Sequence, residues 1–206
     1  MAATMPPRHP LMGGRLCLDF CNTTSDRGSS HDERLESYAD LVGWSSLAGF
    51  LSSEEATRLT RLGTSSPSES LAVWRRAICL REALTSIFRA AAEGRRMRSD
   101  ALAVLNFELA AAMARSQVVP TDAGYTWLWI ERGKALDCVL WPIARSAADL
   151  LTGGPLGAVR RCQGRACGWL FLDTSRNRSR RWCDMRICGN RAKARRHHQR
   201  LKAGAA

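Results

Sequence analysis

The chain has 206 residues, of which 45% are hydrophobic, and it carries 31 lysines and arginines against 19 aspartates and glutamates. This length suits one ordinary domain with a small appendage, and the net charge of +12 favours a polyanionic partner. No stretch has the length of a transmembrane helix, and the N-terminus lacks the charged-then-apolar pattern of a signal peptide. We therefore expect a cytoplasmic protein that does not bind a membrane.

The positive charge is concentrated near the C-terminus. Residues 1–159 hold 17 basic and 17 acidic side chains, whereas residues 160–206 hold 14 basic and 2 acidic ones. The run Thr152-Gly153-Gly154-Pro155 breaks the chain just before this shift. We predict one domain on either side of the break: an α-rich domain over 1–152, for sensing or dimerisation, and a basic nucleic-acid-binding module over 156–206.

Hydrophobic periodicity predicts a mostly helical body with a few short strands. Helical spacing begins near Leu35, and Ser52 with Glu55 forms a capping-box pattern at the start of a second helix. Further helices are expected from Pro67 to Gly94, from Ser99 to Met113 and from Leu136 to Leu150, with strands at 16–20, 117–119 and 125–130. The predicted fold class is α+β, mostly α.

Four cysteines near the C-terminus have the spacing of a metal site. They form two matched sets, Cys162-x4-Cys167-Gly168 and Cys183-x4-Cys188-Gly189. Four thiolates in two close pairs satisfy a tetrahedral zinc ion and leave no open coordination position, so we predict one structural Zn²⁺. The other four cysteines are expected to be small buried hydrophobes rather than disulfides, because a reducing compartment disfavours disulfides: Cys17, Cys21, Cys79 and Cys138.

The arrangement of the two sets predicts a treble-clef-like finger. The glycine after each second cysteine suits a tight turn that lets backbone N–H groups face the sulfurs. A cysteine knuckle would be followed by a hairpin, and the second pair would lie at the start of a helix from Asn190. Because so small and charged a segment buries little apolar surface, zinc is expected to decide whether it folds.

Two basic segments flank the second cysteine pair. Arginine predominates in both, which suits bidentate contacts to phosphates and to guanine edges. Some of these arginines are expected to pack on Trp182 or to bind loop carbonyls instead. The predicted nucleic-acid-binding residues are Arg176, Asn177, Arg178, Arg180, Arg181, Asn190, Arg191, Lys193, Arg195 and Arg196.

The run from Cys183 through Cys188-Gly189-Asn190-Arg191 resembles the CGNR-type zinc finger, which is named for this signature, and the similarity extends back to Phe171. Upstream, the segment from Leu16 to Thr23 is similar to the start of the ABATE-type domain that usually precedes this finger. The resemblance covers nearly the whole chain. It implies a bacterial, stress-related transcription regulator whose finger binds DNA.

Polar residues in the upstream motif have two interpretations. Asp19 and Asn22 could cap the following loop and hold Arg34, which is a structural role. The three residues could instead line a small-molecule pocket, so that the body senses an effector and controls the finger. The structural role is favoured, because polar residues at the exit of a strand commonly satisfy backbone groups.

Together these features predict a zinc-dependent, DNA-binding transcription regulator, associated with the nucleoid. The N-terminal domain could also form a homodimer or bind an effector. Two alternatives remain at this point: an RNA-binding or ribosome-associated protein, in which tryptophans stack on unpaired bases, and a protein-interaction module that uses the basic tail. No enzyme is predicted, because the body lacks a glycine-rich phosphate loop and any pair of catalytic residues at a telling spacing.

Overall fold

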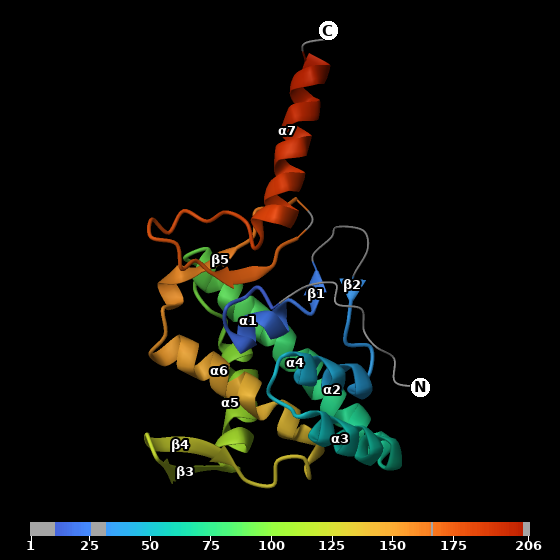
Figure 1. The fold of residues 1–206 in the computed structure, drawn as a ribbon. Coiled ribbons are helices and arrows are strands. Elements are labelled where there is room, and N and C mark those ends of the chain that lie inside the picture. Colours follow the sequence, from blue (N-terminus) through green and yellow to red (C-terminus); the bar gives the residue numbers. More distant parts are fainter. Residues whose placement is uncertain (1–10, 26–31, 166, 204–206) are drawn as a thin grey trace.

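The computed structural model describes residues 11–25, 32–165 and 167–203. Helices dominate these residues, as Figure 1 shows. The α-helices are α1 (Leu16–Cys21), α2 (Tyr38–Leu47), α3 (Ser53–Ser65), α4 (Pro67–Ala92), α5 (Ser99–Met113), α6 (Trp141–Thr152) and α7 (Asn190–Ala203). Shorter helical turns are η1 (Leu136–Val139), η2 (Leu156–Ala158) and the π-helical turn η3 (Met185–Gly189).

The strands form three separate antiparallel pairs. β1 (Thr24–Ser25) pairs with β2 (Asp32–Glu33), β3 (Ser116–Thr121) with β4 (Gly124–Trp129), and β5 (Val159–Arg161) with β6 (Leu170–Leu172). Short strands added to a helical body confirm the predicted fold class, α+β and mostly α.

Helix α4 is the central element of the body. Pro67 begins it, which suits a residue without an N–H to donate, and α3 before it starts with the predicted capping box of Ser52 and Glu55. Leu80, Leu84, Ile87 and Phe88 face the core and are fully buried; α1, α2, α3 and α5 all contact this helix. One buried cluster therefore joins most of the body.

The prediction of a strand at 16–20 is wrong, because these residues begin helix α1. Five of its six residues are buried, since α1 packs against both α4 and α6. A short apolar run that is buried on all sides carries no periodicity by which a helix differs from a strand. The prediction that Cys79 is buried is also wrong: its side chain is exposed on α4, whereas Cys17, Cys21 and Cys138 are buried as expected.

The C-terminal hairpin packs on the body, and α7 projects from it. β5 contacts α4, and β6 contacts α1 and α4. The hairpin does not follow the first cysteine pair as predicted, because β5 and β6 lie on either side of that pair and present it at their connection. Helix α7 extends away from the rest of the chain (Figure 1). No helix among the described residues is both long and apolar enough to span a bilayer.

Candidate zinc site and nucleic-acid interface

The four predicted cysteines come together at the base of α7. Cys162 and Cys167 lie in the connection between β5 and β6, Cys183 follows the long loop after β6, and Cys188 lies in η3. Their ligand atoms all lie within 4.8 Å of one another. A tetrahedron with Zn–S bonds of about 2.3 Å places its sulfurs about 3.8 Å apart.

The observed sulfur separations fit that tetrahedron. The Cys167 and Cys183 sulfurs are 3.6 Å apart, and those of Cys183 and Cys188 are 3.7 Å apart. Three of the four side chains are buried, and Cys167 is half-buried. Four sulfur donors in this arrangement are compatible with one structural zinc, which would be held by Cys162, Cys167, Cys183 and Cys188.

The thiols oppose one another's ionisation. Hydrogen bonds from Cys167 and Cys183 lower the pKa of Cys162. The same hydrogen bonds to Cys162 raise the pKa of Cys167 and, more strongly, that of Cys183. Desolvation by burial raises the pKa of Cys188. Four neighbouring thiolates therefore require a bound cation, and a zinc ion held by these residues would supply that charge.

A glycine that the spacing pattern did not single out gives the sulfurs their room. A Cβ atom at Gly164 would lie 3.2 Å from the Cys188 sulfur and 3.1 Å from Cys167 Cβ. The Gly164 N–H also donates to the Cys162 sulfur at 3.4 Å. The glycines predicted to form tight turns differ: Gly168 has a positive φ of 66°, whereas Gly189 is a packing position, where a Cβ would meet Met185.

A buried carboxylate organises the basic loop between β6 and Cys183. Asp173 accepts hydrogen bonds from the Ser175 N–H at 3.0 Å, from the Ser175 hydroxyl at 2.5 Å and from the Arg180 N–H at 2.9 Å. Desolvation opposes ionisation, but these donors hold the pKa of Asp173 below its usual value. The loop therefore presents Arg176, Asn177 and Arg178 as exposed side chains.

Arg180 is bound within the module instead. Its Nε donates to the Trp182 carbonyl at 2.9 Å, its guanidinium also contacts the Cys183 carbonyl, and its Cζ lies 4.5 Å from the centre of the Phe171 ring. Arg180 thus binds loop carbonyls, as we expect of some of these arginines, but the ring on which it packs is Phe171 and not Trp182. Arg181 is exposed, and its Nε donates to Gln163 Oε1 at 2.7 Å.

A groove of about 260 Å³ opens between α7 and the connection from β5 to β6, which we call the cysteine knuckle. Trp182 lies in its wall, and four arginines from three segments converge on it. Its lining is Arg165, Arg181, Trp182, Ala192, Arg195, Arg196 and Gln199. Arg165 and Gln199 were not predicted as site residues, because their place at the groove depends on how the knuckle folds against α7.

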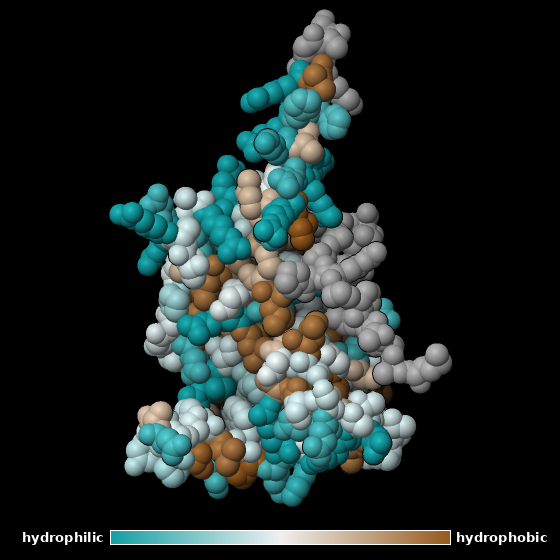
Figure 2. Space-filling model, viewed as in Figure 1, coloured by the Kyte–Doolittle hydropathy of each residue, from teal (hydrophilic) through white to brown (hydrophobic). Residues whose placement is uncertain are grey.

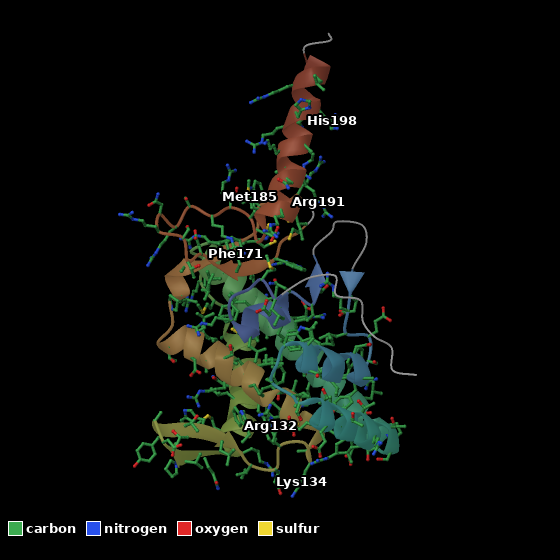
Figure 3. All side chains as sticks on the ribbon, viewed as in Figure 1. Arg132, Lys134, Phe171, Met185, Arg191 and His198 are labelled. Carbon is green, nitrogen blue, oxygen red and sulfur yellow. The ribbon has the colours of Figure 1, made fainter. Side chains whose placement is uncertain are left out.

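Helix α7 continues the basic surface beyond the groove. Asn190, Arg191, Lys193 and Arg196 are exposed, and residues 190–203 include no acidic side chain. Hydrophilic side chains cover most of the helix and the neighbouring loop (Figure 2). Figure 3 shows Arg191 near the base of α7, beside Met185, and His198 farther along the helix.

Two family models match adjoining parts of the chain. The ABATE model, described as "putative stress-induced transcription regulator", matches residues 14–154, and the CGNR zinc finger model matches residues 158–201. The chain belongs to the ABATE family. It combines an ABATE domain with a CGNR zinc finger, as the resemblance implied, and both are families of non-enzymatic kinds. No curated protein matches the sequence.

Residues near the start of the ABATE domain contact the zinc finger. The Asn22 side-chain amide donates to the Leu170 carbonyl at 2.8 Å, and its Oδ1 accepts from the Leu170 N–H at 2.8 Å. Trp169 beside it donates from Nε1 to the Thr24 carbonyl at 3.1 Å, and Arg34 Cζ lies 5.3 Å from the Trp169 ring centre. Asn22 and Arg34 therefore both contact the zinc finger, from opposite ends of the β1–β2 segment.

Asp19 has a different partner. Its Oδ1 accepts from the Gly13 N–H at 2.7 Å, and desolvation raises its pKa to about 6. A cavity of about 100 Å³ lies between α1, α4 and the finger, and Asn22 is one of the residues that line it, together with Cys167 and Trp169. Asp19 and Arg34 are not among the residues that line this cavity.

Proposed function

We propose that this protein is a zinc-dependent transcription regulator whose CGNR finger binds duplex DNA. The observation that carries the proposal is the groove between the cysteine knuckle and α7, where Arg165, Arg181, Arg195 and Arg196 converge. Guanidinium groups that approach from three segments suit a phosphodiester backbone, which carries its charges at regular intervals. Zinc supports this geometry because it fixes both the knuckle and the base of α7.

Helix α7 has the shape and charge of a groove-binding element. Its 14 residues extend about 21 Å, and exposed basic side chains lie along its length. The major groove of DNA, about 12 Å wide, admits one α-helix. In this proposal α7 enters the groove with Arg191 and Lys193, while Arg176 and Arg178 on the loop contact phosphates.

The test measures binding of the zinc-loaded protein to a random-sequence DNA duplex by fluorescence anisotropy between 50 and 200 mM salt. Arg195→Ala and Arg196→Ala are each expected to weaken binding about tenfold and to reduce the salt slope by about one. The matched control is Arg61→Ala, which removes the same charge from an exposed position on α3. Arg61→Ala should leave the affinity unchanged.

Zinc removal provides the second arm. Chelation, or Cys183→Ser, is expected to abolish binding because the arginines then lose their common frame. Equal binding by the chelated protein would contradict the mechanism. A structured RNA that outcompetes the duplex at physiological salt would favour an RNA-binding protein instead, since Trp182 in the groove wall can stack on an unpaired base.

We further propose that the ABATE domain forms a homodimer and couples an effector to the finger. The coupling would pass through the Asn22–Leu170 hydrogen bonds and the adjoining cavity of about 100 Å³, which both domains line. An effector bound there would change how the knuckle that contains Cys167 sits on α4. A cytoplasmic, nucleoid-associated location follows from the proposed DNA binding.

A further inference from the structure

The hairpin of β3 and β4 has one apolar face. Directly paired residues of an antiparallel ladder point to the same side of it. The register pairs Val118 with Trp127, Pro120 with Tyr125, and Ser116 with Trp129, so these residues share a face. That face carries three aromatic rings, a valine and a proline, which is an unusual composition for a hairpin at the surface of a protein.

The residues that the structure describes cover only the root of this face. Trp129 packs on Trp141 of α6, with ring centres 6.0 Å apart, and Arg145 of α6 lies 4.3 Å from the Trp127 ring centre. Exposure then rises toward the tip, from 45% for Trp127 to 57% for Val118 and 80% for Tyr125. The tip therefore projects from the body, and the part of the chain that the structure describes leaves its aromatic face exposed.

An open groove of about 440 Å³ adjoins the root of the hairpin. Trp129, Pro142 and Leu150 give it an apolar floor, and the ion pair of Arg145 and Asp149, 2.8 Å long, lies in its wall. The molecule thus has a projecting aromatic tip and a hollow side by side. Such a pair suits a twofold contact, in which each copy inserts its projection into the hollow of the other.

We propose that the β3–β4 tip of one copy covers the groove of a second copy, and that this contact forms the homodimer. The inference rests on the dimer of the proposed function and names its surface. The apolar face and the groove offer on the order of 600 Å² per copy, near the roughly 800 Å² per partner of a standard interface. A smaller or polar partner would leave much of this surface uncovered.

The distribution of charge favours a second copy at this end of the molecule. The sequence of β4 contains no charged residue, and residues 1–159 are electrically balanced. The basic finger lies at the opposite end from the hairpin (Figure 1), so two copies can associate here without bringing their excess positive charges together. The same arrangement leaves both α7 helices accessible to DNA.

The test measures the oligomeric state of the full-length, zinc-loaded protein without DNA, by sedimentation velocity between 1 and 100 µM. The wild type is expected to be a dimer. Tyr125→Lys should raise the dimer dissociation constant at least tenfold, because it places a charge at the tip of the hairpin, which the proposed dimer buries. Gly153→Arg should do the same from the groove side, where an added side chain meets open space and leaves the fold intact.

Leu47→Lys is the matched control, since Leu47 is 54% exposed on α2, away from the hairpin. This variant should dimerise like the wild type. A wild type that is monomeric at 100 µM, or a Gly153→Arg variant that dimerises normally, would overturn the proposal; so would capture of a membrane or a different protein by a monomeric hairpin. If such a monomer still binds DNA, the proposed DNA binding by the zinc finger stands although the proposed dimer contact is wrong.

Discussion

Gly164 lies where the sulfur atoms leave the least room for a side chain. A Cβ there would approach the Cys188 sulfur to 3.2 Å and Cys167 Cβ to 3.1 Å, so the ligands would have to move by a few tenths of an ångström. Zinc tolerates little distortion of its sulfur tetrahedron. We expect Gly164→Ala to weaken zinc binding about tenfold in competition with a chromophoric chelator. Gly157→Ala, where a Cβ meets open space, should bind zinc like the wild type.

Asp19 makes the stability of the fold depend on pH. Burial raises its pKa from 3.8 to about 6, so the folded protein binds this proton more tightly than the unfolded chain does. The resulting stability is fully present below about pH 4 and is lost as the pH rises through 6. Between pH 5 and 7 we expect the free energy of unfolding of the wild type to fall by about 1 kcal/mol relative to Asp19→Asn.

Urea unfolding of the two proteins at pH 5, 6 and 7 measures this difference. Asparagine keeps an oxygen that accepts from the Gly13 N–H but has no proton to lose, and each comparison at one pH cancels the contributions of other groups. A constant difference across this range would show that Asp19 is ionised in the folded protein.

At the scale of elements, α1 and β6 are joined by the two hydrogen bonds of Asn22. Both involve the backbone of Leu170, and both are buried. Asn22→Ala leaves a buried N–H and a buried carbonyl without partners, at about 1–3 kcal/mol each. We therefore expect the variant to lose on the order of 2–5 kcal/mol of unfolding free energy in urea, measured by circular dichroism.

The control for this prediction is Asn106→Ala on α5, where the side chain is exposed and the substitution should be nearly neutral. Equal stabilities for the two variants would mean that the Asn22 contact does not hold the finger on the body. Both variants should bind zinc with nearly the affinity of the wild type, because neither asparagine contacts the cysteine sulfurs.

The sequence predicts a helix, a strand or a metal site correctly where hydrophobic periodicity or residue spacing is informative. The capping box at Ser52, the helix from Asn190 and the strands at 117–119 and 125–130 follow from local chemistry that tertiary packing did not override. Helix α1 was missed because its residues are buried on all sides. Cysteine spacing predicted the metal site, whereas Gly164 and Arg165 matter only through the three-dimensional fold of the knuckle.

At the scale of the whole molecule, the finger shares the core of the ABATE domain. Val159, Leu170 and Leu172 are buried in the same cluster as residues of α1 and α4. Phe171, on the opposite side of β6, packs with the cysteines instead. The β5–β6 hairpin therefore has one face toward the metal site and one face toward the body.

This shared core predicts that zinc stabilises the entire chain. Structural zinc contributes about 10–16 kcal/mol in finger peptides, and its loss would free the hairpin that covers α1 and α4. We expect calorimetry to show one cooperative transition for the zinc-loaded protein, and chelation to lower its midpoint by about 10 °C or more, since 1 kcal/mol corresponds to roughly 2–4 °C at this size. Chelator added to Cys183→Ser should cause no further shift. Two separate transitions, with the ABATE transition unchanged by chelation, would show that the hairpin is dispensable to the body and that zinc acts on the finger alone.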